Sequence, residues 1–128
     1  PGWALVVFHG LRNAAYVREQ TRGWDRVTFV SLDVEDLSRQ EYADLRRSAW
    51  LFDVLEGIGA EKVLFFECDG VVLRPGVERF MRYVNIGAPW HWGILEEHDA
   101  KVGNGGVCLR DVAWCRQALR FVGASEHG

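Results

Sequence analysis

The sequence predicts an α/β domain in which a mostly parallel sheet is flanked by helices. Three short runs of almost continuous apolar residues, at 3–9, 27–32 and 62–66, are typical of strands buried on both faces. Segments with helical spacing alternate with these runs, as in parallel sheets with crossover helices. The length of 128 residues suits one domain, and a hydrophobic fraction of 48% with a charged fraction of 26% is ordinary for a globular chain.

The first half of the chain begins with the strand at 3–9, which ends at Gly10. A short helix is expected at 12–21, and the second strand follows at 27–32. The acidic stretch 33–36 comes directly after that strand. Ligands of parallel sheets bind at the carboxyl ends of the strands, so the segments that follow strands are the places to search for a site.

The longest predicted helix begins with the capping box Ser38-Arg39-Gln40-Glu41. In such a box the serine hydroxyl and the glutamate carboxylate each accept a bond from an exposed backbone N–H. Apolar residues then recur at helical spacing and are expected to form one core-facing stripe: Tyr42, Leu45, Ala49, Phe52 and Leu55. Gly57 and Gly59 are expected to end this helix.

The strand at 62–66 is apolar almost throughout, so we expect it in the interior of the sheet, as a parallel neighbour of the two earlier strands. The pattern after it predicts a helical turn at 75–83 and short strands at 85–90 and 106–110. A last helix is expected at 111–122, with an aspartate as its first residue.

Charge and cysteine content argue against several classes of protein. The net charge of −3 disfavours a dedicated nucleic-acid binder. No apolar run approaches the ~20 residues of a membrane span, and no signal peptide is expected because the chain runs straight into a strand. The three cysteines form no C-x-x-C pair, so neither a zinc site nor a disulfide framework is predicted, and their odd number suits a reducing compartment.

Two acidic residues follow the 62–66 strand. Glu67 and Asp69 are two positions apart, and residues at that spacing in a strand share a face. Two carboxylates followed by Gly70 could hold a hard divalent cation that also binds substrate phosphates. The alternative is a pair of solvated acids at a strand end.

The segment 63–72, Val-Leu-Phe-Phe-Glu-Cys-Asp-Gly-Val-Val, also resembles the first motif of haloacid-dehalogenase-type phosphatases. In that family an apolar strand ends in Asp-x-Asp-Gly-Val/Thr. The sequence departs from it by placing Glu67 where the family has its nucleophilic aspartate. The motif also lies in mid-chain, with 58 residues after Gly70 for the rest of the family's apparatus.

Two further segments resemble paired motifs of a domain-of-unknown-function family of glycosyltransferase-like proteins with a GT-A fold. They are Tyr-Val-Asn-Ile-Gly-Ala-Pro-Trp at 83–90 and Val-Gly-Asn-Gly-Gly-Val-Cys-Leu-Arg at 102–110. The family pattern runs Tyr-Ile-Gly-Ala-Pro-Trp, then a variable loop, then Gly-Asn-Gly-Gly-x-Ser-Leu-Arg. Its upstream Gln-Thr-Asp corresponds to residues 67–69 here. Further landmarks match at Trp3, His9, Asn13, Tyr42 and Trp50, so the resemblance covers essentially the whole chain.

The chain departs from this family at four points. Cys108 replaces the usual serine and Glu67 replaces glutamine. The chain starts one strand later than GT-A domains generally do, and it ends before an acidic segment that the family carries. The resemblance implies one GT-A-like domain over residues 1–128, partial at both ends, with a Rossmann-like nucleotide-diphospho-sugar transferase core.

The implied activity is transfer of a sugar from a nucleotide-sugar donor to a glycan or small-molecule acceptor. A divalent cation, Mn²⁺ or Mg²⁺, would neutralise the departing diphosphate. Asp69 is the first expected ligand and Glu67 the second, and His127 could join them if the tail folded back. The alternative from another class is a non-catalytic sugar- or nucleotide-binding remnant of the family.

The resemblance also implies sugar- or phosphate-binding residues, each with a structural alternative. The glycines would allow close approach of a ligand, or would form a plain turn capped by the asparagine. The aromatic run would offer a flat surface to a sugar ring, or would pack in the core, and the arginine would bind phosphate or form a salt bridge. These residues are Gly103, Asn104, Gly105, Gly106, Trp90, His91, Trp92 and Arg110. Asp99 and Glu97 are the two candidates for the catalytic base, and the spacing selects neither.

Overall fold

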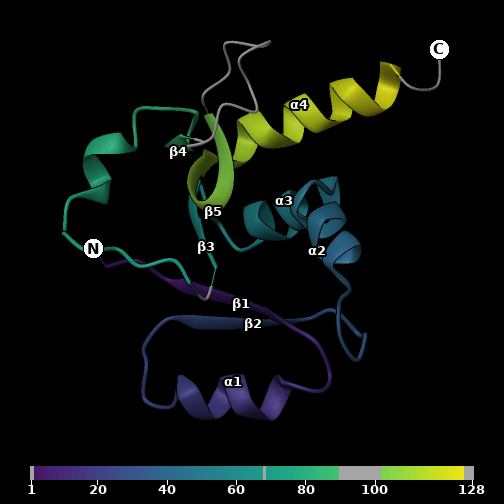
Figure 1. Ribbon diagram of the computed structural model, residues 1–128, viewed down its shortest axis with the longest axis vertical. Helices are drawn as coiled ribbons and strands as arrows, with labels where there is room; N and C mark the ends of the chain where they lie inside the picture. The colour runs from purple at the N-terminus through teal and green to yellow at the C-terminus, as the bar shows by residue number, and fades with distance from the viewer. Residues whose placement is uncertain (1, 68, 90–101, 126–128) are drawn as a thin grey trace. The chain divides into compact units, whose positions relative to one another are not determined.

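The computed structural model describes residues 2–67, 69–89 and 102–125 (Figure 1). The chain forms two compact units, Pro1–Arg46 and Arg47–Gly128. The first contains a small parallel sheet and the second a separate antiparallel sheet, with helices in both. The predicted α/β class is therefore confirmed, whereas the finer prediction of a Rossmann-like GT-A core remains a prediction.

The first unit is built on two parallel strands. β1 (Leu5–His9) pairs with β2 (Val27–Ser31) in continuous register from one end to the other. α1 (Ala14–Gln20) connects them and lies along one side of the strand pair in Figure 1. α2 (Arg39–Arg46) follows, and the predicted capping box is present. The Glu41 N–H donates to Ser38 Oγ over 3.2 Å, and the Ser38 N–H donates to the Glu41 carboxylate over 2.8 Å.

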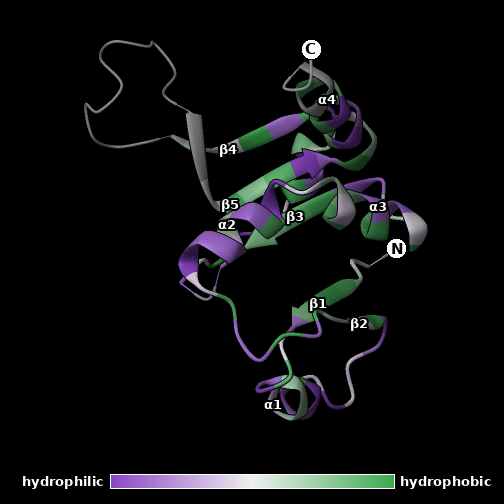
Figure 2. Cartoon of the chain, turned by 90° about the vertical axis from the view of Figure 1, so that its right-hand side faces the viewer, coloured by the Kyte–Doolittle hydropathy of each residue, from purple (hydrophilic) through white to green (hydrophobic). Residues whose placement is uncertain are grey.

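The second unit contains a three-stranded antiparallel sheet in the order β3-β5-β4. β3 (Lys62–Phe66) and β4 (Asn85–Pro89) both pair with the longer β5 (Val102–Asp111). Figure 2 shows that most of β3 and part of β5 are hydrophobic. A short 3₁₀ helix, η1 (Val77–Phe80), lies at the predicted helical turn.

Two helices pack together in the second unit, α3 (Ala49–Gly57) and α4 (Val112–Ser125). The Phe52 ring of α3 meets the Phe65 ring of β3 edge-on, with 6.1 Å between the ring centres. α4 starts at Val112, one residue after the predicted start, and the side chain of the preceding Asp111 accepts the Trp114 N–H in its first turn over 2.8 Å.

The prediction that β3 is an interior strand with parallel neighbours is wrong. Within the described part of the chain β3 lies at the edge of its sheet, β5 holds the centre, and the pairing is antiparallel. The physical reason is that an apolar run does not determine the direction of the neighbouring strand, nor that both faces of the strand are covered: residues 62–65 are half-buried and Phe66 is exposed.

The single long helix predicted after residue 38 is also wrong, because it consists of α2 and α3. Between them Ser48 takes an extended conformation (φ −82°, ψ 141°), and its hydroxyl accepts the Leu51 N–H over 3.2 Å. Ser48 is thus the N-cap of a new helix. The apolar stripe splits accordingly: Phe52 and Leu55 are buried, while Tyr42 of α2 is exposed.

Burial is distributed unevenly between the two units. Among the residues whose burial is described, the apolar side chains that are almost completely buried all belong to the second unit: Leu51, Phe52, Leu55, Cys108, Leu109, Val112 and Cys115. The buried side chain of the first unit is that of His9, whose Nδ1 lies 3.1 Å from the Gly10 carbonyl. Among the described helices, none has the length and apolar character needed to cross a membrane.

Candidate functional site

A pocket lies at the carboxyl ends of the two parallel strands of the first unit. Its volume is about 470 Å³, within the range of ligand-binding pockets. The segment after β1, the segment after β2 and one side chain of α2 line it. The lining residues are Phe8, Gly10, Arg12, Asn13, Leu32, Glu35, Asp36, Leu37 and Tyr42.

Close backbone contact between the two segments shapes the floor of this pocket. The Leu11 N–H donates to the Val34 carbonyl over 2.7 Å, so the chain after β1 stays paired with the chain after β2. At Gly10 a Cβ atom would lie 2.7 Å from the Glu35 carbonyl oxygen. This oxygen belongs to the backbone and cannot rotate away as a side chain would, so only glycine allows the two segments to approach this closely.

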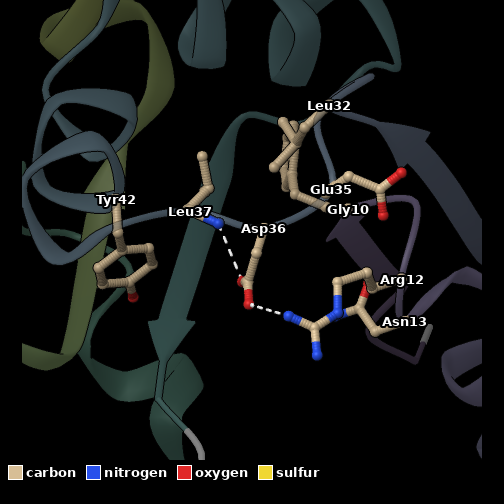
Figure 3. Close-up of a pocket in the computed structure, with 9 residues that line it drawn as sticks. Gly10, Arg12, Asn13, Leu32, Glu35, Asp36, Leu37 and Tyr42 are labelled. Carbon is tan, nitrogen blue, oxygen red and sulfur yellow. Dashed lines mark hydrogen bonds and ion pairs between the residues drawn. The ribbon is translucent and has the colours of Figure 1, made fainter.

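Charged side chains stand around the mouth of the pocket (Figure 3). The Arg12 guanidinium faces the Asp36 carboxylate, at 3.4 Å between Nη1 and Oδ2. The other Asp36 oxygen accepts the Leu37 N–H over 2.9 Å. The Tyr42 ring comes from α2 and lies on the far side of Asp36 from Arg12. The Arg12–Asp36 pair is well exposed, so its contribution to stability is small and both groups are accessible to a ligand.

In the second unit the two predicted metal ligands lie where the chain turns after β3. The Glu67 N–H donates to the Gly106 carbonyl over 2.9 Å, and the Gly70 N–H donates to the Glu67 carbonyl over 2.8 Å. Asp69 is exposed and Glu67 half-buried. Because the strand ends at residue 66, the shared strand face expected for the two acids is replaced by a turn.

This turn, from Glu67 to Gly70 and described at all its residues except Cys68, packs closely against the glycine-rich part of β5. A Cβ atom on Gly70 would lie 2.8 Å from the Val107 side chain and 3.5 Å from the Gly106 carbonyl oxygen. The acidic and glycine-rich motifs are therefore neighbours, although almost forty residues separate them in sequence.

The glycine-rich segment forms an irregularity in β5. Gly87 of β4 is opposite Cys108, but the next residue, Ala88, is opposite Asn104. Residues 105–107 are therefore extra on the β4 side and form a bulge. Glycines inside strands commonly mark bulges, and bulges are frequent beside functional sites. We call residues 105–107 the glycine bulge below.

The chemistry of the 67–70 turn suits a hard divalent cation. Mg²⁺ is commonly held by one or two carboxylates together with substrate phosphates and water, and Glu67 and Asp69 supply two carboxylates. Within residues 2–67, 69–89 and 102–125, no group of three or more His, Cys, Asp and Glu side chains is placed to hold a metal ion. A cation at this turn would thus depend on phosphate or water for further ligands.

The other predicted site residues are distributed as follows. Gly103 and Asn104 lie in β5 before the glycine bulge. Arg110 lies four residues beyond Gly106, about 13 Å along the strand, and its guanidinium stacks 5.5 Å from the Phe65 ring centre. The aromatic run and both candidate bases lie outside the described residues, as does the tail histidine: Trp90, His91, Trp92, Glu97, Asp99 and His127.

The pocket of the first unit was not predicted from the sequence, although two features of the sequence indicate it. One is Gly10, placed directly after an apolar strand. The other is the acidic stretch 33–36 after the second strand. In a parallel pair both segments meet at one edge, and this is where the pocket lies.

Residues 26–126 match the family described as "Protein of unknown function (DUF5672)", which covers most of the 128 residues. The chain belongs to the DUF5672 family. No significant match was found among curated proteins or among solved structures. The matched range of this DUF5672 protein includes α2, the 67–70 turn and the glycine bulge, while β1 and α1 precede it.

Proposed function

We propose that this DUF5672 protein transfers a sugar from a nucleotide-sugar donor with the help of a divalent cation, Mn²⁺ or Mg²⁺. The observation that carries the proposal is the contact between the two motifs of the second unit. The 67–70 turn, with its two carboxylates, is hydrogen-bonded to the glycine bulge through Glu67 and Gly106. Carboxylates beside a backbone without side chains suit a cation and a close-lying diphosphate or sugar.

In this proposal Asp69 is the principal ligand because its side chain is exposed, and Glu67 acts second, directly or through water. The cation would supply Lewis-acid stabilisation of the negative charge on the departing diphosphate. The glycine bulge would let the donor approach the backbone of β5. The candidate bases Asp99 and Glu97, and the sugar platform at 90–92, are kept as proposals from sequence.

The pocket of the first unit supports nucleotide binding independently. It lies at the carboxyl edge of a parallel strand pair, where nucleotides commonly bind. The acidic Glu35 and Asp36 follow its second strand, as the ribose-binding acid does in dinucleotide-binding folds. Tyr42 offers an aromatic face, and Arg12 a guanidinium that suits phosphate.

Calorimetric titration with nucleoside diphosphates, with Mn²⁺ and with EDTA, tests the cation at the turn. We expect at least one diphosphate to bind the wild-type protein only with Mn²⁺. Asp69→Asn should weaken that binding about tenfold or more, equivalent to about 1.4 kcal/mol, while leaving the melting temperature of the free protein unchanged. Asp25→Asn makes the same charge change at an exposed position of the other unit and is the control.

Two results would overturn this assignment. One is the absence of Mn²⁺-dependent binding by the wild-type protein. The other is an Asp69→Asn variant that binds like wild type, or that loses stability in the absence of metal, which would make Asp69 a structural residue. If binding occurs but no nucleotide sugar is cleaved or transferred, the protein is the non-catalytic remnant considered from the sequence.

A separate titration tests the pocket. Asp36→Asn should weaken nucleoside binding in EDTA, because the neutral amide is a poorer acceptor for ribose hydroxyls, and Asp25→Asn should not. If Asp36→Asn and Asp25→Asn bind the nucleoside with equal affinity, the nucleoside does not bind in this pocket.

A further inference from the structure

Cys108 is the residue at which the regular part of β5 meets the glycine bulge. It is opposite Phe65 of β3 on one side and Gly87 of β4 on the other, so both neighbouring strands fix its backbone. Toward the start of β5, the pairing with β4 becomes irregular immediately after this position. Its side chain is 3% exposed and therefore has little freedom to move.

The thiol of Cys108 reaches back across the bulge. Its Sγ lies 3.7 Å from the Gly105 carbonyl oxygen, within the range of a hydrogen bond donated by sulfur. A thiol is a weak donor, but here it is held in a buried position and bonds to a segment with two consecutive glycines. Glycine has the largest conformational freedom to lose, so such a segment needs an external restraint.

The restrained segment is the one that contacts the acidic turn. The Gly106 carbonyl, one residue beyond the bonded carbonyl, accepts the Glu67 N–H over 2.9 Å. A chain of short contacts thus links the Cys108 thiol, through Gly105 and Gly106, to the backbone of Glu67. A change in the bulge would be transmitted to the turn that holds the carboxylates.

We propose that Cys108 is a positioning residue that fixes the glycine bulge and thereby the 67–70 turn for donor binding. Its role is conformational, through the hydrogen bond to the Gly105 carbonyl, and requires no ionised or reactive thiol. The effect of Cys108 on donor binding rests on the function proposed above. Its effect on the conformation of the 67–70 turn is independent of that function.

Three variants test the proposal. Cys108→Ala removes the donor, and Cys108→Ser keeps a hydroxyl that can donate to the same carbonyl. Cys115→Ala is the control, since Cys115 is the other cysteine described as buried, and it lies on α4 and outside the bulge. The first readout is hydrogen exchange of the Glu67 amide by NMR, relative to amides of α3. The second is calorimetric affinity for nucleoside diphosphates with Mn²⁺.

In Cys108→Ala we expect the Glu67 amide to exchange about tenfold faster relative to α3 amides, and Mn²⁺-dependent binding to weaken about tenfold. Cys108→Ser should stay near wild type, and Cys115→Ala should lower global stability without a selective effect on Glu67. Equal effects of the two alanine variants at Glu67 would overturn the proposal. So would a serine variant that behaves like Cys108→Ala, because side-chain volume would then explain the effect.

This experiment distinguishes a failure of the proposed function from a failure of the positioning role of Cys108. If the wild-type protein binds no nucleoside diphosphate, the proposed function fails, while the exchange of the Glu67 amide still decides whether Cys108 holds the turn. If wild type binds and Cys108→Ala binds equally well, the proposed function stands and the positioning role in donor binding is refuted.

Discussion

Replacement of Gly10 by alanine tests the close approach of the two segments that form the pocket floor. The added Cβ would lie 2.7 Å from the Glu35 carbonyl oxygen and 3.0 Å from that of Val34, whereas ordinary contacts begin at 3.4 Å. The nearer carbonyl must therefore move by about 0.7 Å, the difference between 3.4 and 2.7 Å. Both obstacles are backbone atoms, so no side-chain rotation can relieve the contact.

The energetic cost of this change follows from overpacking. Forced backbone shifts of this kind typically cost about 1–3 kcal/mol. The shift also pulls the Val34 carbonyl away from the Leu11 N–H, which it now accepts over 2.7 Å. We expect the loss to be near the upper end of that range and to fall on β1 and β2 rather than on the second unit.

Native-state hydrogen exchange measures this effect for each unit. In Gly10→Ala the amides of β1 and β2 should exchange about 5- to 150-fold faster, the equivalent of 1–3 kcal/mol, with little change in α3. Gly57→Ala is the control, because nothing lies within 4 Å of its Cβ position and alanine suits a helix better than glycine. Wild-type exchange rates in Gly10→Ala would refute the steric argument.

Three further predictions concern stability. The Trp114 N–H and then the Lys62 ammonium bond to Asp111 and lower its pKa. The stability that the Asp111 carboxylate contributes is therefore complete above its unfolded pKa of about 3.9. It is lost as the pH falls from that value through the lower pKa of the folded state. Asp111→Asn should therefore reduce the dependence of the unfolding free energy on pH in this range. Burial raises the pKa of the Cys115 thiol, so stability should fall as the pH rises above about 8.5, and Cys115→Ala should abolish that slope in urea titrations at pH 7–10. Ser48→Ala should lower the free energy of unfolding by about 1 kcal/mol, measured with urea, because it removes the N-cap of α3; a loss close to zero would contradict the cap.

The positions of β1, β2 and β3 and the start of α2 could be predicted from local signals. Apolar runs marked β1, β2 and β3, and the Ser38–Glu41 box fixed the start of α2. The sheet topology could not be predicted in this way, because the antiparallel pairing of β3 is made with β5, some forty residues later. The break between α2 and α3 was not predicted, because the helical spacing of apolar residues continues across Ser48.

The parts of the candidate site that consist of recognisable side chains were predicted from the sequence. The parts that are formed by backbone groups were not. Glu67 and Asp69 could be named because two acids after a strand are a recognisable pattern. That the Glu67 N–H contacts Gly106 depends on strand register, which composition does not determine. The pocket around Gly10 depends on two carbonyl groups of another segment, and any residue type there would supply them.

The uneven burial of the two units has a consequence for how the protein opens. The almost completely buried apolar side chains lie in Arg47–Gly128, while Pro1–Arg46 relies on a two-stranded sheet, an arrangement that is marginal by itself. The first unit should therefore unfold at lower free energy than the second, and proteases should cut it first. A ligand in the pocket of that unit would raise its opening free energy by about 2.7 kcal/mol at a hundredfold excess over Kd. Occupancy of the pocket would then control how fast proteases cleave the first unit.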